Sequence, residues 1–401
     1  MSNAAAAGVR RELLNKVPAI TAVFWVIKIL STTVGETFSD YLAVNVGLGP
    51  TITDSVTFVA LAAALFVQFR TPRYTPWIYW LSVVLISICG TQITDFFTDT
   101  LGISLYVSTA VFSVLLALVF VVWYRQEMTL SITSINTPRR EAFYWLAILT
   151  TFALGTAAGD LATEALGLGF RNGSLIFGAG FLLTLVAWRA GAWPTAAFWA
   201  AYILTRPLGA SVGDLLTQDQ SLGGLGLGAV RTSLLFFAVI LVLVVREQLV
   251  ANRVGARDKV GGPSLGNRRD LAWAAAGAAT VILVGGWMST TVSAPASATA
   301  VTAASASSLG DLSQYQAIVS DVQARNDAGD SAGAVTRIKD LEVAWDSAES
   351  GLKPRDPKDW HTMDTAIDHA LTAVRATPAD QAASAKALTA LQDTMTQLTG
   401  G

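Results

Sequence analysis

The chain has 401 residues, of which 52% are hydrophobic and only 14% are charged. A soluble domain usually carries about 25% charged residues, so this composition excludes a wholly soluble protein and places most of the chain in lipid. The charges are also unevenly distributed. Residues 293–401 contain 14 acidic and 8 basic side chains, whereas the preceding 292 residues contain 15 acidic and 19 basic ones. The two parts therefore belong to different surroundings.

Nine apolar stretches are long enough to cross a bilayer core, which requires about 20 residues of helix. They cover residues 18–44, 52–69, 76–101, 104–124, 141–166, 172–188, 194–217, 228–245 and 271–291. A short basic segment, residues 1–17, precedes the first stretch and has no small-residue cleavage site, so we expect a retained helix and not a signal peptide. The expected fold class is an all-α polytopic membrane protein with nine transmembrane helices.

The basic residues of the loops orient these spans. One side of the membrane receives Arg10, Arg11, Lys16, Arg70, Arg73, Arg125, Arg139, Arg140, Arg189 and the basic loop 247–270, whereas the opposite short loops hold little beyond Arg171 and Arg231. Short cytoplasmic loops carry the excess of Lys and Arg. The chain is therefore expected in a cytoplasmic membrane, with its N-terminus inside and its C-terminus outside.

A sequence pattern recurs four times within residues 18–246, in segments 18–70, 75–125, 140–189 and 193–246. An aromatic residue and a tryptophan are followed by nine residues and a glycine, then by four residues and an aspartate. In the first three copies six residues and a second glycine come next, whereas the fourth copy departs, with an insertion that reaches Gly226. The tryptophans are Trp25, Trp80, Trp145 and Trp199, the first glycines are Gly35, Gly90, Gly155 and Gly209, and the aspartates are Asp40, Asp95, Asp160 and Asp214. Self-similarity at a fixed spacing indicates a repeat architecture.

With this pattern, most clearly in residues 28–49 and 155–169, the chain resembles a family of bacterial integral membrane proteins that is defined by a tandem repeat of unknown function. The resemblance covers about residues 16–246. It implies a membrane architecture of tandem two-helix repeats in a bacterial membrane, and it implies no particular activity.

Small residues follow each first glycine at four-residue intervals, up to Gly47, Gly102 and Gly167 in the first three copies. This spacing predicts a helix-packing seam, because small residues on one face let backbones approach closely. Each copy has two spans, so all four copies point the same way and the symmetry axis should run along the membrane normal. The four aspartates then lie at one depth, in the outer third of the membrane if the tryptophans pack or anchor near the cytoplasmic boundary.

Four carboxylates at equivalent places in a membrane suggest an ion or proton pathway, because a charged group there is expensive to keep. Hard divalent cations favour such oxygen ligands, and Glu36 lies one helical turn before Asp40. The structural alternative is that the aspartates cap helix ends or bond to neighbouring hydroxyl groups. They could also lie close enough to the boundary to be solvated.

Two basic residues distinguish the first and fourth copies. Lys28 lies within the first span, and Arg206 precedes Pro207 in the seventh. They could pair with acids of neighbouring copies, or bind an organic anion in place of a cation. Pro207 and the adjacent glycines are expected to break the seventh helix, as in transporters that expose backbone groups to a substrate.

The ninth span, 271–291, is followed by a linker of small residues, 292–308, and by an acidic segment, 309–401, that we expect to form a small soluble four-helix bundle. Helix caps are expected at Asp330, Asp356 and Asp380. The core candidates are Leu341, Trp345, Leu352, Trp360, Ile367, Leu371, Leu388 and Leu391.

Residues 340–368 of this segment look like helical extracytoplasmic domains attached to some bacterial membrane proteins, including iron-permease-like ones. A cation-capturing cluster of Glu342, Glu349, Asp364 and Asp368 is one hypothesis, and a solvated acidic surface is the other. Asp364 shares a helical face with Trp360, so we expect it to be partly buried.

The function that these patterns favour is transport of a divalent metal cation coupled to protons, with one aspartate per repeat binding or relaying the ion. The alternatives are a non-transporting sensor or envelope-stress protein and an organic-anion transporter that uses Lys28 and Arg206. An enzyme is not expected: metalloprotease and phosphate-loop motifs are absent, and the two histidines, His361 and His369, lie in the acidic segment. No cofactor or nucleic-acid partner is expected beside the bilayer and the ion, and the sequence leaves substrate, direction and oligomeric state open.

Overall fold

The structure is a computed structural model that describes residues 15–40, 50–191, 193–220, 223–254 and 307–399. The repeats, here called the repeat domain, form eight long helices. These are α2 (Ala22–Asp40), α3 (Pro50–Arg70), α4 (Pro76–Asp95), α5 (Leu105–Glu127), α6 (Pro138–Asp160), α7 (Gly169–Arg189), α8 (Pro194–Thr217) and α9 (Ala229–Val254). Two five-residue π-helical turns, η2 (Phe96–Thr100) and η4 (Leu161–Ala165), extend α4 and α6, and a short 3₁₀ turn, η3 (Ile132–Ser134), precedes α6.

Proline starts the first helix of the second, third and fourth copies, at Pro76, Pro138 and Pro194. Its fixed φ angle suits the first helical position, where its missing N–H costs nothing. The first copy departs from this rule, because α2 begins at Ala22 although the predicted span started at residue 18.

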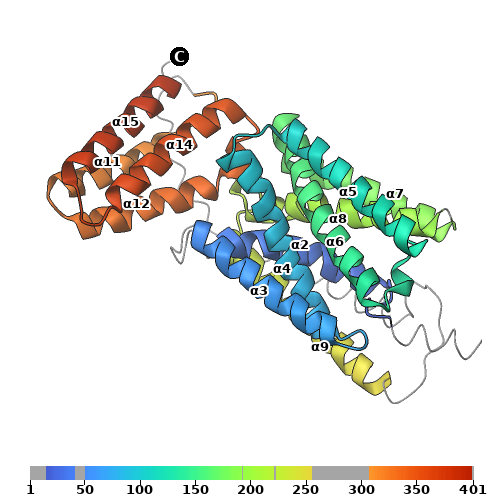
Figure 1. The fold of residues 1–401 in the computed structure, drawn as a ribbon. Helices are drawn as coiled ribbons and strands as arrows, with labels where there is room; N and C mark the ends of the chain where they lie inside the picture. Colours follow the sequence, from blue (N-terminus) through green and yellow to red (C-terminus); the bar gives the residue numbers. More distant parts are fainter. Residues whose placement is uncertain (1–14, 41–49, 192, 221–222, 255–306, 400–401) are drawn as a thin grey trace, which may run out of the picture.

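The first helix of every copy is an inner helix and the second is a peripheral one (Figure 1). The inner helices α2, α4, α6 and α8 contact one another in that order, and α8 returns to contact α2. Burial agrees with this arrangement: 72% of the apolar windows of α4 and α6 is buried inside the protein, against 17–28% for α3, α5, α7 and α9. The copies therefore form a closed ring of four inner helices.

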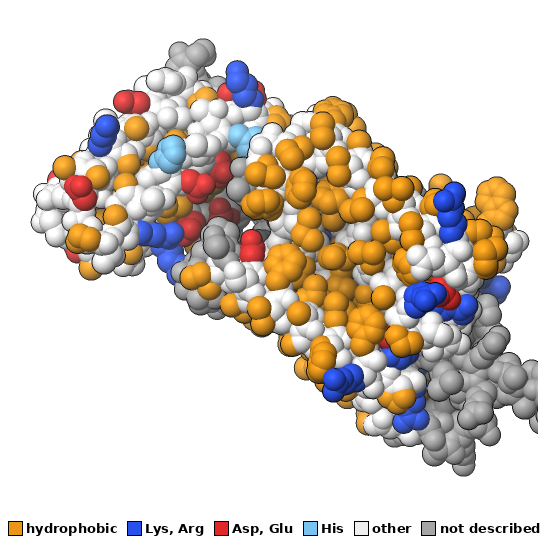
Figure 2. Space-filling view, in the orientation of Figure 1, with side chains coloured by type: hydrophobic (Ala, Val, Ile, Leu, Met, Phe, Trp, Pro, Cys, Tyr) orange, Lys and Arg blue, Asp and Glu red, His pale blue; other side chains and the backbone are white. Residues whose placement is uncertain are grey.

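The peripheral helices turn apolar side chains outward, and Figure 2 shows them as a broad hydrophobic surface on the repeat domain. Among the described residues, six helices are long and apolar enough to cross a membrane, namely α3, α4, α5, α6, α7 and α9. In α2 the apolar part is shorter, Ala22–Gly35. The chain is thus a membrane-type helical protein; the predicted ninth span, 271–291, lies outside the described residues.

Residues 307–399 form the C-terminal domain, with helices α11 (Ser313–Asp327), α12 (Ser331–Asp346), the short α13 (Glu349–Leu352), α14 (Pro357–Val374) and α15 (Gln381–Thr399). The predicted caps are present: Asp330 accepts from Gly333 N, Asp356 from Asp359 N, and Asp380 from the amides of Ala382 and Ala383. All eight predicted core residues are buried in one hydrophobic cluster, separate from that of the repeat domain.

Candidate functional site

The first glycine of each copy lies where the next inner helix approaches most closely. A methyl group on Gly35 would lie 2.7 Å from Ser87 Oγ, and one on Gly90 would lie 2.6 Å from Phe152 Cβ. Gly155 meets Arg206 in the same way, and Gly209 closes the ring on Thr32. In every copy the neighbour is the residue three positions before the next copy's glycine. These close approaches are the geometry that a packing role of the glycines requires, and they follow fourfold pseudosymmetry.

The second repeat glycine has a different role from the one predicted. Gly102 and Gly167 have φ angles of +64° and +66°, and a methyl group on either would meet nothing within 4 Å. They follow the π-helical turns η2 and η4. A left-handed residue just past a helix is a usual C-terminal stop. These glycines end the inner helices and do not belong to the packing seam.

The tryptophan pairs of the four copies form a buried ring at one end of the inner helices, which we call the aromatic end. The aromatic residue of each copy contacts the tryptophan of the next. The ring centroids are 5.5 Å apart for Phe24–Trp80, 5.4 Å for Tyr79–Trp145, 6.2 Å for Tyr144–Trp199 and 5.7 Å for Phe198–Trp25. All eight side chains are at most 5% exposed. They pack against one another between the inner helices and are not exposed on the outer surface of the bundle.

The segment before α2 is bound across the aromatic end. Lys16 Nζ lies 2.5 Å from Glu141 Oε2 and donates to the Phe69 carbonyl at 2.9 Å. Gln68 Nε2 donates to the other carboxylate oxygen of Glu141 at 3.1 Å, and Glu141 is only 1% exposed. One carboxylate thus joins the N-terminal segment, α3 and α6. Together, these contacts and the aromatic ring close this end of the bundle.

Lys28 and Arg206 both lie buried on the axis, between the aromatic ring and the opposite end. Arg206 donates to Thr156 Oγ1 at 3.0 Å and to Thr91 Oγ1 at 2.8 Å. Lys28 Nζ is 3.6 Å from the centroid of the Phe152 ring, and no described residue offers it a hydrogen-bond acceptor. The equivalent residues of the second and third copies are the apolar Val83 and Ile148, so Lys28 is a departure from the repeat.

The predicted break at Pro207 is wrong: α8 continues through it from Pro194 to Thr217. The carbonyl of Ile203, which proline leaves without its usual helical donor, faces Gly155 of α6. Gly159 approaches Pro207 itself, and a methyl group there would lie 3.1 Å from Pro207 Cβ. Close packing against two glycines supports a continuous helix at this proline.

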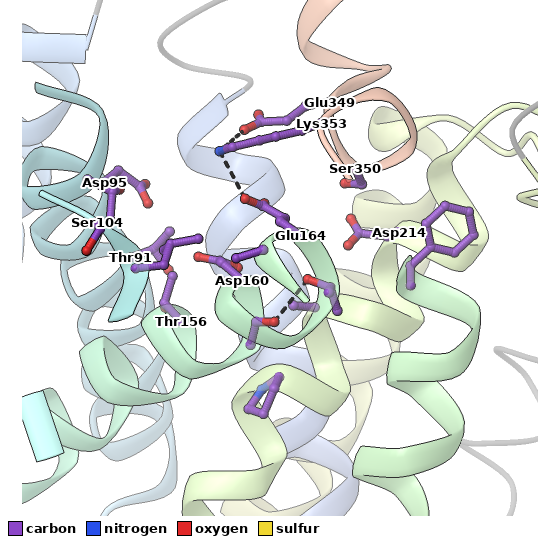
Figure 3. Close-up of a pocket in the computed structure, with 18 of the residues that line it drawn as sticks. Thr91, Asp95, Ser104, Thr156, Asp160, Glu164, Asp214, Glu349, Ser350 and Lys353 are labelled. Atoms are coloured by element: carbon purple, nitrogen blue, oxygen red, sulfur yellow. Dashed lines mark hydrogen bonds and ion pairs between the residues drawn. The ribbon is translucent and has the colours of Figure 1, made fainter. Parts of the chain in front are cut away.

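At the end opposite the aromatic ring, the inner helices surround a cavity of about 580 Å³ that we call the aspartate cavity (Figure 3). Asp95, Asp160 and Asp214, three of the four repeat aspartates, line it. Thr91 and Thr156, the two hydroxyl groups that hold Arg206, line its inner part. The side chains of Glu36 and Asp40 lie outside the described residues. The sequence predicted the repeat aspartates at one depth, and the structure brings three of them to one cavity.

Two of these aspartates lie where an α-helix changes into a π-helical turn: Asp95 before η2 and Asp160 before η4. Such turns widen the helix and are frequent at functional sites. They were not predicted from the sequence. The only signal was the constant spacing of six residues between aspartate and second glycine, which we interpreted as one continuous helix.

The C-terminal domain completes the aspartate cavity, which the sequence did not predict. Glu349, Ser350, Lys353, His361 and Thr365 line it from the side of α13 and α14. Lys353 Nζ lies 2.9 Å from Glu349 Oε1 and 3.3 Å from Glu164 Oε2 of the repeat domain, as the dashed lines of Figure 3 mark. Figure 2 shows acidic side chains gathered where the two domains meet.

Three of the four carboxylates predicted to capture a cation in the C-terminal domain are bound to other side chains. Glu342 binds Arg375 through both carboxylate oxygens, Glu349 pairs with Lys353, and Asp364 accepts from Trp345 Nε1 at 2.9 Å. No group of three or more His, Cys, Asp or Glu side chains in the described part of the chain is arranged to hold a metal ion. We therefore do not place a metal site at Glu342, Glu349, Asp364 and Asp368.

Asp364 is nevertheless electrostatically unusual. Its carboxyl group is half-buried beside Trp345, and burial, followed by repulsion from Asp368 and Glu349, raises its pKa to about 7. The hydrogen bond from Trp345 and the nearby Lys353 oppose this rise. The pKa of Asp368 is also raised, chiefly by burial. The expectation that Asp364 is partly buried is confirmed.

Four consecutive segments of the chain, residues 23–74, 78–129, 143–190 and 197–250, match the family model described as Repeat of Unknown Function (DUF347). They cover just over half of the chain and coincide with the four copies of the pattern. No curated protein and no solved structure matches the chain.

Proposed function

The chain belongs to the family of the Repeat of Unknown Function (DUF347), and the description of this family names no activity. From the geometry of the aspartate cavity, we propose that the protein is a membrane transport protein for a cationic solute. The observation that carries the proposal is the aspartate cavity, built from equivalent positions of several copies. A cavity of about 580 Å³ lies within the usual range of about 300–1,000 Å³ for small-molecule sites.

The charges of the cavity favour a cation. Its lining includes five carboxylates, Asp95, Asp160, Glu164, Asp214 and Glu349, against the single ammonium of Lys353. Hydroxyl groups of several serines and threonines supply further oxygen ligands, which hard cations prefer. The divalent metal cation inferred from the sequence remains our first candidate. It would keep much of its water shell here, as Mg²⁺ commonly does, because the described carboxylates do not form a close three-ligand group.

The alternative of an organic anion is less favourable. Arg206 does not line the aspartate cavity, and its guanidinium group is occupied by Thr91 and Thr156. Lys28 lies among aromatic rings. An anion would have to pass the five carboxylates before it reached either cation, whereas a cationic solute would be concentrated by them.

The closed aromatic end suggests how transport would proceed. The lining of the cavity includes Thr91 and Thr156 but none of the residues of the aromatic ring, and Lys28 and Arg206 are buried between the two. Passage therefore requires the inner helices to move apart at the aromatic end while the cavity closes, which is alternating access. Lys28 and Arg206 would repel a cation from the axis. Proton coupling, which the repeated carboxylates suggest, is part of our proposal, with these carboxylates releasing protons when they bind the cation.

The same reasoning gives an orientation. Basic side chains gather at the aromatic end, which we assign to the cytoplasm by the positive-inside rule (Figure 2). The aspartate cavity and the C-terminal domain then lie on the extracytoplasmic side of a bacterial cytoplasmic membrane. This proposal is supported by α9, which ends at the aromatic end, and by the C-terminal domain, which lies at the other end.

The test is uptake of Mg²⁺, Mn²⁺ and Ca²⁺ into proteoliposomes, together with the elemental content of cells that over-express the protein. Asp214→Asn and Asp95→Asn should each lower transport at least tenfold at equal protein levels. Asp54→Asn is the matched control, because Asp54 lies on the peripheral helix α3 and does not line the cavity. If no cation accumulates with the wild-type protein, transport of these ions is excluded and a sensor function becomes the better proposal.

A further inference from the structure

The C-terminal domain lines the aspartate cavity from outside the repeat domain, and polar contacts join the two domains. Residues of α13 and α14 line the same cavity as Asp160 and Asp214 (Figure 3). Apart from Lys353–Glu164, a hydrogen bond from Gln218 Nε2 to the Ser347 carbonyl, 2.8 Å long, joins the domains. Their hydrophobic cores are separate clusters. Motion of one domain against another is the default expectation unless the interface is large and hydrophobic.

Lys353 is the central residue of this contact. Its side chain is only 9% exposed, and lysine is almost never that buried without partners. Its ammonium lies between Glu349 of its own domain and Glu164 of the repeat domain, with the Trp360 ring 4.7 Å away. A positive charge therefore already occupies the mouth of a cavity whose other charged groups are mainly carboxylates.

We propose that the C-terminal domain is a lid on the aspartate cavity and that Lys353 is a tethered competitor of the cationic solute for Glu164. A solute cation that reaches the cavity replaces the ammonium at Glu164 and loosens the lid, whereas an empty cavity keeps it closed. Because linkage is reciprocal, the closed lid lowers the apparent affinity for the solute by the same factor by which the solute opens the lid. The identity of the competitor rests on the proposed transport of a cation, but the lid does not.

The experiment measures the distance between the two domains. Spin labels are attached to Thr133→Cys, in the loop at the aromatic end, and Thr389→Cys, on α15; both positions are exposed. The native Cys89 is buried and stays unlabelled. Double electron–electron resonance on the full chain in nanodiscs then gives the distribution of distances between the two labels. It is measured without added divalent cation, with Mg²⁺, and with Na⁺ at the same ionic strength as the Mg²⁺ sample.

We expect one narrow distribution for the unliganded protein and a broad one for Lys353→Gln and for Glu164→Gln. Lys353→Arg, which keeps the charge, and Lys358→Gln, an exposed lysine of α14, should remain narrow. Mg²⁺ should broaden the distribution of the starting protein, and Na⁺ should not. A narrow distribution in Lys353→Gln would overturn the lid, and a lid that opens in Lys353→Gln but ignores Mg²⁺ would overturn the competition.

These outcomes separate the inference from the proposed function, because opening in Lys353→Gln requires no transport. If the lid opens in this variant while no cation is taken up into proteoliposomes, the lid is retained and the transport proposal fails. If Mg²⁺ uptake depends on Asp214 but the lid stays closed in Lys353→Gln, transport is retained and the lid fails.

Discussion

At the scale of single residues, two glycines of the repeat domain give a direct test of the packing seam. Gly209→Ala would place a methyl group against Thr32 and 2.8 Å from the Ile29 carbonyl, so the backbones of α8 and α2 must separate. We expect a loss of about 1–3 kcal/mol, as for other overpacked sites. Gly180→Ala on α7 is the control, because its nearest contact would be an ordinary 3.5 Å to Leu204 Cδ1.

The control variant should gain up to about 1 kcal/mol, because alanine favours a helix over glycine. Thermal unfolding in detergent, followed by helical circular dichroism, measures both variants. Opposite signs support the seam. Equal effects at the two positions would mean that the inner helices do not meet at Gly209.

Asp364 predicts how the stability of the C-terminal domain depends on pH. Its folded pKa of about 7 lies above the ordinary value of 3.8, so the folded state binds this proton more tightly than the unfolded state. The contribution to stability is therefore greatest below pH 4 and is lost as the pH rises to about 7. About three pKa units correspond to at most about 4 kcal/mol, and partial exposure reduces this figure.

We expect Asp364→Asn to stabilise the domain at pH 8 and to have little effect at pH 4, because the amide oxygen still accepts from Trp345. Residues 307–399 have their own core, so thermal unfolding of this segment between pH 4 and 8 measures the effect. Asp393→Asn, an exposed position on α15, should leave the pH profile of the wild type unchanged. A profile unaltered by Asp364→Asn would contradict the raised pKa.

At the scale of secondary-structure elements, the sequence predicted where helices lie better than how they end. Apolar length alone locates the eight helices of the repeats. The π-helical turns after Asp95 and Asp160 were not predictable from hydrophobicity, since a π turn and an α turn bury the same residue types. Gly102 and Gly167 were misassigned for a related reason: a glycine that packs and a glycine that ends a helix look alike in one sequence.

The first turn of α6 predicts a strong effect from one buried charge. Glu141 receives Lys16 and Gln68 and is almost fully buried, so Glu141→Gln leaves the Lys16 ammonium without its counter-ion. Breaking a buried pair on one side typically costs about 3–5 kcal/mol. Arg139→Gln is the control: Arg139 is 67% exposed and 3.8 Å from Glu127, and such pairs contribute about 0–1 kcal/mol.

Chemical unfolding in mild detergent with increasing sodium dodecyl sulfate ranks the two variants. Glu141→Gln should unfold at clearly lower denaturant, and Arg139→Gln should match the wild type. An equally small loss in both would show that the segment before α2 is not held at the aromatic end. The closure of this end in the proposed transport cycle would then depend on the aromatic ring alone.

At the scale of the whole molecule, the repeat itself made the candidate site predictable. Four copies that point the same way are expected to bring equivalent residues to one depth, and the structure shows Asp95, Asp160 and Asp214 around one cavity. The docking of the C-terminal domain was not predictable, because Lys353 and Glu164 are far apart in the sequence and belong to no shared pattern. The burial of Lys28 among aromatic rings was not predictable either. Lys28 has no equivalent in the other copies, so only tertiary packing determines which side chains surround it.

The orientation of the whole molecule yields the last prediction. Thr133→Cys lies at the aromatic end and Thr389→Cys lies on the C-terminal domain, at the opposite end of the protein. The native Cys89 is buried, so we expect no labelling there. In intact cells whose outer barrier admits small reagents, a membrane-impermeant maleimide should label Thr389→Cys, and should label Thr133→Cys only after the membrane is permeabilised. The reverse pattern would put the aspartate cavity in the cytoplasm and turn the proposed direction of access around. Labelling of both from one side would mean that the two ends do not lie across a membrane from each other, and the assignment of the aromatic end to the cytoplasm would be lost with it.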